Sequence, residues 1–212
     1  MSELRDLSAR KENRAVRAFF AWELPAGAKA ALGALVRELS TRPDGGTVRW
    51  VRNEGYHVTL RFLGNVASSL LPELVAAVRR ELGATQPFEV TLGAPHAFPS
   101  AREPRVVVVT ALPEAPLAAL AARIEAGVVA AGLPAEKRRF RAHLTLGRVR
   151  SRRLPPLDET RAAAPAALRV AEVVLFQSDL GEGGSRYTPL ARLPLPSSAS
   201  PADPLPLPTS FQ

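Results

Sequence analysis

The sequence repeats one four-residue pattern, as His57-Val58-Thr59-Leu60 and again as His143-Leu144-Thr145-Leu146. Side chains on a β-strand alternate between its two faces, so each copy predicts a strand that presents a histidine and a threonine together. The two apolar residues of each copy would then anchor the opposite face in a core. We therefore expect two strands of the same kind that bring their polar faces to one site.

The elements around the two motifs also repeat in order, as a strand, a helix and then the motif strand. Two such units would pack around a pseudo-twofold axis, with the motif strands facing each other across a cleft. The first unit is predicted at 15–24, 26–39 and 56–63, and the second at 105–110, 116–131 and 144–149. Further strands are predicted at 48–51, 88–92, 168–178 and 186–193, and a further helix from 68 or 69 to 82.

The chain has 212 residues, which allows one domain or two small lobes that share a core. We expect a flexible polar tail at 1–14, a single folded domain at 15–193 and a disordered tail rich in proline and serine at 194–212. No apolar run reaches the length of about 18 residues that a membrane helix needs. The absence of cysteine excludes disulfides and thiolate metal sites, and it fits a cytoplasmic protein.

A net charge of +8 favours anionic partners such as nucleic acids or phosphate esters, although it also fits a solvated, arginine-rich surface. Two histidines across a cleft suit phosphodiester cleavage, which needs a base on the attacking water and an acid on the leaving oxygen. The threonine hydroxyls could donate to the phosphate oxygens. Neither motif has the spacing of a helical zinc site, and no ATP-binding loop is present, so we predict no metal and no cofactor. A structural role for each histidine is the alternative.

The chain resembles the 2H phosphoesterases, specifically the bacterial RNA 2′,3′-cyclic phosphodiesterases, which are also called 2′-5′ RNA ligases or LigT-like proteins. The resemblance covers about residues 15–193 in order and spacing. One departure is Ala142, where the family usually has a proline before the second histidine. The matching stretches are 17–21 with Leu24-Pro25, then 48–51, 56–64, 97–99, 104–106, 140–148 and 178–187.

The resemblance implies an α+β fold with two lobes related by a pseudo-twofold axis, whose antiparallel sheets line a central cleft with the helices outside. It implies hydrolysis of a terminal RNA 2′,3′-cyclic phosphate to a 2′-phosphomonoester without metal, and possible reverse ligation that makes a 2′-5′ linkage. In that mechanism His57 is the proton donor and His143 the proton acceptor. Thr59 and Thr145 would hold the phosphate.

Three further residues are candidates for substrate binding. The resemblance suggests that Arg148 contacts phosphate, but its odd offset from His143 puts it on the other strand face unless the strand bulges near Gly147. Arg61 shares the face of His57 by parity and could line the cleft. Tyr56 could stack on a base, although core packing is the alternative.

Two other functions remain open at this point. The chain could be a non-catalytic module that binds RNA or a nucleotide, or a phosphodiesterase for a small cyclic nucleotide. The intact histidines and threonines favour the enzyme. We expect a monomer whose partner is RNA with a 2′,3′-cyclic phosphate end, and no membrane partner.

Overall fold

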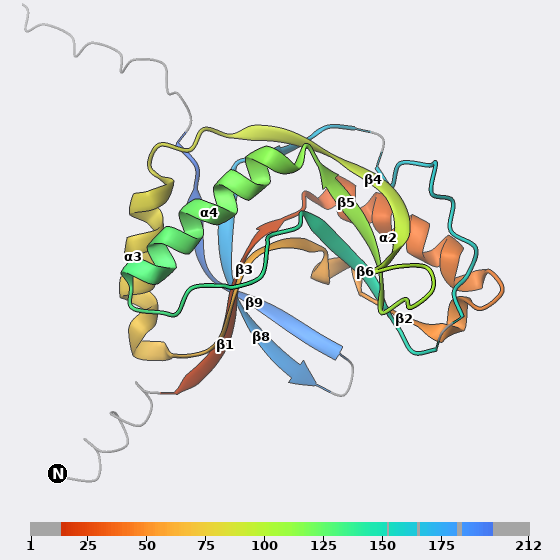
Figure 1. Ribbon diagram of the computed structural model, residues 1–212, viewed down its shortest axis with the longest axis horizontal. Coiled ribbons are helices and arrows are strands. Elements are labelled where there is room, and N and C mark those ends of the chain that lie inside the picture. The colour runs from red at the N-terminus through yellow and green to blue at the C-terminus, as the bar shows by residue number, and fades with distance from the viewer. Residues whose placement is uncertain (1–13, 152, 165, 182–183, 197–212) are drawn as a thin grey trace, which may run out of the picture.

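The computed structural model describes residues 14–151, 153–164, 166–181 and 184–196 (Figure 1). The tails predicted at either end lie mostly outside these ranges and stay predictions. The folded part continues beyond residue 193, where we expected it to end. Leu195 is only 4% exposed, and its N–H donates to the carbonyl of Ala171. The boundary of the domain is therefore about two residues later than the composition suggested.

All the strand pairings in the described chain are antiparallel, and they join the strands into one curled sheet. The order across it is β7-β4-β5-β6-β3-β1-β8-β9, and β2 pairs with β6. The strands are β1 (Ala15–Glu23), β2 (Val48–Trp50), β3 (His57–Ala67), β4 (Phe88–Phe98), β5 (Val106–Leu112), β6 (His143–Val149), β7 (Leu168–Val170), β8 (Glu172–Gly181) and β9 (Gly184–Pro194). The helices are α2 (Ala26–Thr41), α3 (Leu71–Leu82) and α4 (Glu114–Ala130), with short 3-10 turns at Gly45–Thr47, Asn53–Gly55 and Ser68–Leu70.

The two motif strands, β3 and β6, lie side by side at the centre and divide the molecule into two halves (Figure 1). One half contains β1, β8 and β9 with helices α3 and α4, which pack on each other. The other contains β2, β4, β5 and β7 with helix α2 (Figure 1). The predicted α+β class with antiparallel strands in two lobes is confirmed. The two expected sheets are joined through a single pair, Val58 with Leu144.

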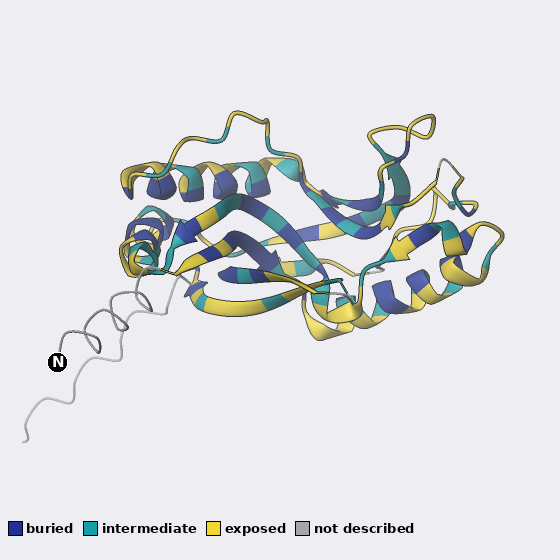
Figure 2. Cartoon of the chain, turned by 90° about the horizontal axis from the view of Figure 1, so that it is seen from below, coloured by how far each residue is buried: buried dark blue, intermediate teal, exposed yellow. Residues whose placement is uncertain are grey.

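The apolar residues of the two motifs are in the main core, as their alternation predicted. Val58 and Leu144 have no exposed surface, and neither has Leu146. The run Val107–Val109 on β5 is also fully buried, which fits a strand covered on both faces. Figure 2 shows that the helices turn their buried residues inward and their exposed residues to solvent.

Two of the irregularities in strand register change which candidate side chains share a face. Phe20 of β1 pairs with Arg61, but the next residue of β1 pairs with Thr59, so β3 contains one extra residue at this point. Val107 of β5 pairs with Gly147, but the next residue of β5 pairs with Thr145, so β6 also contains one extra residue. Because a bulge shifts the alternation by one, residues beyond it appear on the face opposite to that expected from parity.

The crossing of α3 and α4 depends on Gly127, and this generates a stability prediction. A Cβ added there would lie 2.6 Å from the Cα of Val78, so the helices must move apart. We expect Gly127→Ala to lower the free energy of unfolding by about 1–3 kcal/mol, as overpacking does. Urea denaturation measures this change.

Gly27, in the first turn of α2, is the matched control, because a Cβ there meets nothing within 4 Å. Gly27→Ala should leave the stability unchanged or raise it by up to about 1 kcal/mol through helix propensity. Equal effects of the two substitutions would contradict the close approach of the helices at Gly127.

Candidate active site

The register between β3 and β6 brings the four polar residues of the two motifs to one face of the sheet. Val58 pairs with Leu144, so the same register places His57 across from Thr145, and Thr59 across from His143. The four polar side chains are partly exposed, whereas the apolar residues between them are buried on the other face. The arrangement that the repeated pattern predicted is therefore present, with a histidine and a threonine from each strand.

Both imidazoles are held by the same local hydrogen bond. Nδ1 of His57 lies 2.8 Å from the carbonyl oxygen of Gly55, and Nδ1 of His143 lies 2.8 Å from that of Arg141. A carbonyl oxygen only accepts, so Nδ1 carries the hydrogen and donates it in both rings. Nε2 of each neutral ring is then left with a lone pair that can accept a proton. The two histidines are thus prepared alike for proton transfer.

Aromatic rings surround His57. Its ring centroid lies 4.8 Å from that of Phe19, 4.9 Å from that of Tyr187 and 6.3 Å from that of Phe176. Burial among these rings penalises the charged imidazolium and lowers the pKa of His57 from 6.5 to about 4. The hydrogen bond to Gly55 opposes this shift without cancelling it. His57 is therefore neutral at pH 7 in the free protein.

His143 lies in more open surroundings. One ring, that of Phe98, stacks on it at 5.9 Å with an interplanar angle of 12°. The guanidinium of Arg141 lies over the Phe98 ring, 5.8 Å from its centre. Ala142, which departs from the family pattern, is buried, and its carbonyl accepts the N–H of Ala111. A backbone hydrogen bond thus fixes the entry to the second motif without proline.

Arg148 lies on the same face as His143, because the strand bulges where the sequence argument required it. Thr145 pairs with Val108, and Arg148 pairs with Val106, two residues away on β5 and on the same face. The extra residue on β6 lies between them, at Leu146. Arg148 is exposed, so its guanidinium is available to an anion bound near the histidines.

Arg61 and Tyr56 are buried away from this face, so their positions do not support the predictions that they bind substrate. The bulge in β3 turns Arg61 towards α4, where it is 9% exposed, pairs with Glu125 and donates to the carbonyl of Pro134 at 2.6 Å. Parity failed for Arg61 because it assumed an unbroken strand. Tyr56 has no exposed surface and belongs to the main core, where burial raises the pKa of its phenol to about 12.

The aromatic residues around His57 were not among the site residues predicted from the sequence. Phe19 could have been suspected, because β1 is apolar on consecutive residues, which indicates a strand with both faces covered. Phe176 and Tyr187 could not, because they reach His57 only through the pairing of β8 with β1 and of β9 with β8. His96, the third histidine of the chain, lies within β4 and pairs with Val108.

Among the described residues, no group of three or more His, Asp or Glu side chains is placed to hold a metal ion. None of the described helices combines the length and apolar surface that a membrane crossing needs.

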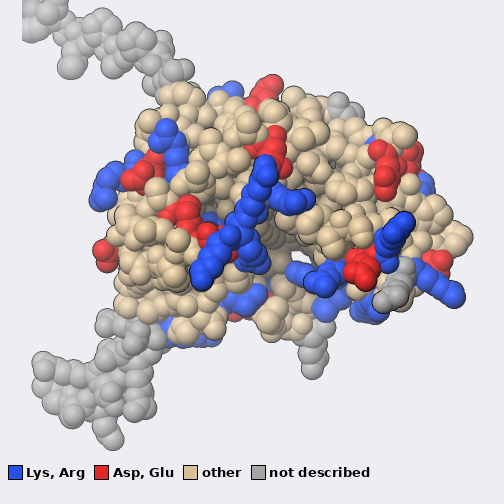
Figure 3. All heavy atoms as spheres, in the orientation of Figure 1, with Lys and Arg blue, Asp and Glu red and all other residues tan. Residues whose placement is uncertain are grey.

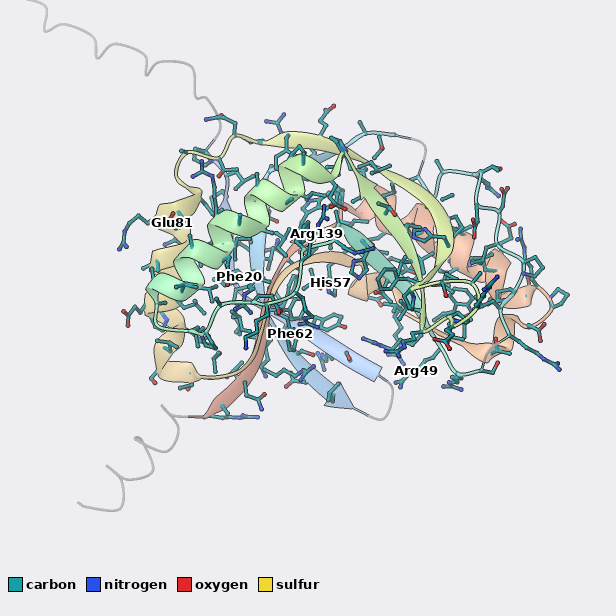
Figure 4. The ribbon with its side chains drawn as sticks, viewed as in Figure 1. Phe20, Arg49, His57, Phe62, Glu81 and Arg139 are labelled. Carbon is teal, nitrogen blue, oxygen red and sulfur yellow. The ribbon has the colours of Figure 1, made fainter. Side chains whose placement is uncertain are left out.

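The surface around the histidines is hollowed and basic. Figure 3 shows a depression near the centre of this face, with Lys and Arg side chains on both sides of it. In Figure 4, His57 lies at this central gap, Arg139 lies above it in the view and Arg49 points towards it from the lower right. The site therefore combines two proton-transfer groups with a positive border, which suits an anionic substrate.

Comparison with known proteins agrees with this geometry. The sequence model of the 2′-5′ RNA ligase superfamily matches residues 28–182. The chain belongs to this family, the 2H phosphoesterases. An RNA 2′,3′-cyclic phosphodiesterase of Methanothermobacter thermautotrophicus is 30% identical over 82% of this chain and 95% of its own length.

Two further similarities support the family and the fold. An RNA 2′,3′-cyclic phosphodiesterase of Geobacillus stearothermophilus is 28% identical over 84% of this chain, which spans only 56% of that longer relative. The crystal structure of E. coli LigT complexed with 3′-AMP superposes with a TM-score of 0.70 at 27% identity. That alignment covers 86% of this chain and 99% of LigT. The lobed antiparallel fold is thus common to the family.

The environment of His57 generates a prediction about its titration. In the free protein, NMR of the imidazole should show that His57 titrates near pH 4, because the surrounding rings disfavour the charged form. An unfolded chain takes up this proton near pH 6.5, so His57 should make the folded state progressively less stable as the pH falls from 6.5 to 4. Titration of His57 at its ordinary value would contradict the desolvated environment.

Proposed function

We propose that this chain hydrolyses RNA 2′,3′-cyclic phosphate ends to 2′-phosphomonoesters by acid–base catalysis with two histidines. The observation that carries the proposal is the pairing of β3 with β6, which puts both histidines and both threonines on one face. The names of the relatives, RNA 2′,3′-cyclic phosphodiesterases, support RNA as the substrate class.

The proposed reaction is an in-line displacement at phosphorus. His143 takes a proton from water through Nε2, and the water oxygen forms a bond to phosphorus. The bond from phosphorus to the 3′-oxygen breaks, and His57 gives a proton to that oxygen. The two proton transfers balance, so the enzyme needs only to return a proton from His143 to His57 through solvent.

The threonines and Arg148 would stabilise the charge that develops on the phosphate. Thr59 and Thr145 each lie across from the histidine of the other strand, so their hydroxyls can donate to the non-bridging oxygens. Arg148 lies on the same face and offers a fixed positive charge. Such donors act best where water is excluded, as it is beside the aromatic rings around His57.

The donor role of His57 requires the substrate to restore its proton. With a pKa of about 4 in the free protein, His57 holds little of the acid form at pH 7. A phosphate anion bound beside the ring favours the imidazolium and raises this pKa, and the attraction is strong where aromatic rings exclude water. The acid is then formed mainly in the complex. Ligation to give a 2′-5′ linkage would use the same groups in the same roles, with the 5′-hydroxyl of a second RNA in place of water.

The first test is an assay with a short RNA that ends in a 2′,3′-cyclic phosphate, in excess EDTA. We expect conversion to a 2′-phosphate end by the wild type. His57→Ala and His143→Ala should each lose about a hundred- to ten-thousand-fold in kcat, because each removes one proton transfer. His96→Ala is the matched control and should keep activity, since it removes the third histidine from outside the two motifs.

Three results would overturn parts of the proposal. No turnover by the folded wild type would favour a binding module or a small cyclic nucleotide as substrate. Activity that disappears with EDTA would reopen metal catalysis. An equal loss in the His96→Ala variant would show that the two motifs have no special role.

The pH dependence gives an independent check on paired acid and base groups. A plot of kcat/KM against pH should be bell-shaped, because one histidine must be neutral and the other protonated. We expect the two limbs to disappear separately when each histidine is replaced. A flat profile between pH 5 and 8 would contradict the two-histidine mechanism.

A further inference from the structure

Arg49 and Arg148 form a pair of like charges that needs an anion. They are direct partners across β2 and β6, both are exposed, and both lie on the face of His143 and Thr145. The ion pairs between described residues involve other arginines, so neither guanidinium has an acidic partner there. Like charges directly opposite one another destabilise a sheet. A phosphate bound at each guanidinium would relieve this repulsion.

Arg49 also reaches from one half of the molecule to the other. Its Nη2 atom would lie 3.0 Å from a Cβ added at Gly184, at the tip of the hairpin between β8 and β9. That hairpin belongs to the half that carries Tyr187, which packs on His57. In Figure 4 the side chain of Arg49 points into the gap between β2 and the hairpin. Arg49 therefore lies on β2, one strand away from Arg148 on β6, and its side chain reaches towards the hairpin of the other half.

A second group of cations lies in the loop between α4 and β6. The sequence there is Lys137-Arg138-Arg139-Phe140-Arg141, and its four basic residues are exposed. Arg138 pairs with Glu136, and Arg141 lies over the ring of Phe98. Arg139 has no ion-pair partner among the described residues, and in Figure 4 it lies on the opposite side of His57 from Arg49.

The partly buried ion pair of Arg61 with Glu125 fixes this loop. Arg61 donates to the carbonyl of Pro134, and the other carboxylate oxygen of Glu125 accepts the N–H of Glu136 at 2.7 Å. Both loop contacts come from side chains of the first motif strand and of α4. The loop that carries Arg139 is therefore held against the strand of His57, and its charge is presented at a defined place.

We propose that Arg49 and Arg139 bind backbone phosphates of the RNA upstream of its cyclic end. The inference rests on the proposed function and deepens it, because it names the polymer as the preferred substrate. A cyclic mononucleotide has only the reacting phosphate, which the histidines, threonines and Arg148 hold. An oligonucleotide has further phosphates, and unpaired cations on two sides of the site can bind them. The site should therefore prefer oligonucleotides to cyclic mononucleotides.

The test compares two substrates, a five-nucleotide RNA with a 2′,3′-cyclic phosphate end and 2′,3′-cyclic AMP. For Arg49→Gln and Arg139→Gln we expect KM for the RNA to rise about tenfold with kcat unchanged, and both constants for cyclic AMP to stay the same. The slope of log(kcat/KM) against log[salt] for the RNA should become shallower by about 0.7 for each lost phosphate contact. Arg80→Gln, which removes the same charge from an exposed position on α3, is the control and should change neither substrate.

Two kinetic results would overturn the inference. Unchanged KM for the RNA in both variants would show that neither arginine binds the strand. Equal losses with the RNA and with cyclic AMP would show that the arginines act on the reacting phosphate instead of upstream phosphates.

A binding measurement separates this inference from the proposed function. Fluorescence anisotropy with the same RNA ending in a 2′-phosphate requires no turnover. If the wild type cleaves neither substrate but binds this RNA, and the two variants bind it about tenfold more weakly, the upstream site stands and the proposed reaction fails. If the variants and Arg80→Gln all bind as the wild type does, the upstream site is overturned whatever the activity.

Discussion

The antiparallel pairing of β3 with β6 is the constraint on which the site depends. Val58 and Leu144 are fully buried partners at the one point where these strands pair. Their burial sets the register, because a slip of one residue would turn the histidines into the core and the apolar residues to solvent. The cost of burying an imidazole without a partner would oppose that slip. The same apolar contacts that join the two halves therefore also place the two histidines and the two threonines.

Strand bulges decide which arginines belong to the site. Without the extra residue in β3, Arg61 would share a face with His57, and without the one in β6, Arg148 would face the core side. The bulges reverse both expectations. Arg61 becomes an internal ion-pair partner of Glu125, and Arg148 becomes an exposed cation beside His143. The guanidinium of Arg148 on β6 therefore lies on the face of the histidines. The guanidinium of Arg61 on β3 instead holds the loop that precedes β6.

The two histidines are alike in local structure and different in surroundings. Each donates from Nδ1 to the carbonyl two residues earlier, which is a property of the strand entry in both motifs. His57 is enclosed by three rings from β1, β8 and β9, whereas His143 stacks on one ring from β4. A pseudo-symmetric framework has therefore produced an asymmetric pair. Burial lowers the pKa of His57 more than its local hydrogen bond raises it. The acid role proposed for His57 therefore depends on the negative charge of the bound phosphate.

The sequence by itself indicated most of the strands and helices and the four motif residues, because alternation and helical spacing are local properties that the chain carries from residue to residue. The single strand predicted at 168–178 is two strands, β7 and β8, and the one predicted at 88–92 continues to Phe98. It also indicated an anionic substrate through its charge, and the family through its motifs. Only the tertiary structure decided the faces of Arg61 and Arg148, because a bulge depends on the partner strand. It also decided the rings around His57 and the positions of Arg49 and Arg139. The rings, Arg49 and Arg139 come from distant parts of the sequence. Non-local strand pairing and the ion pair of Arg61 with Glu125 bring them to one site.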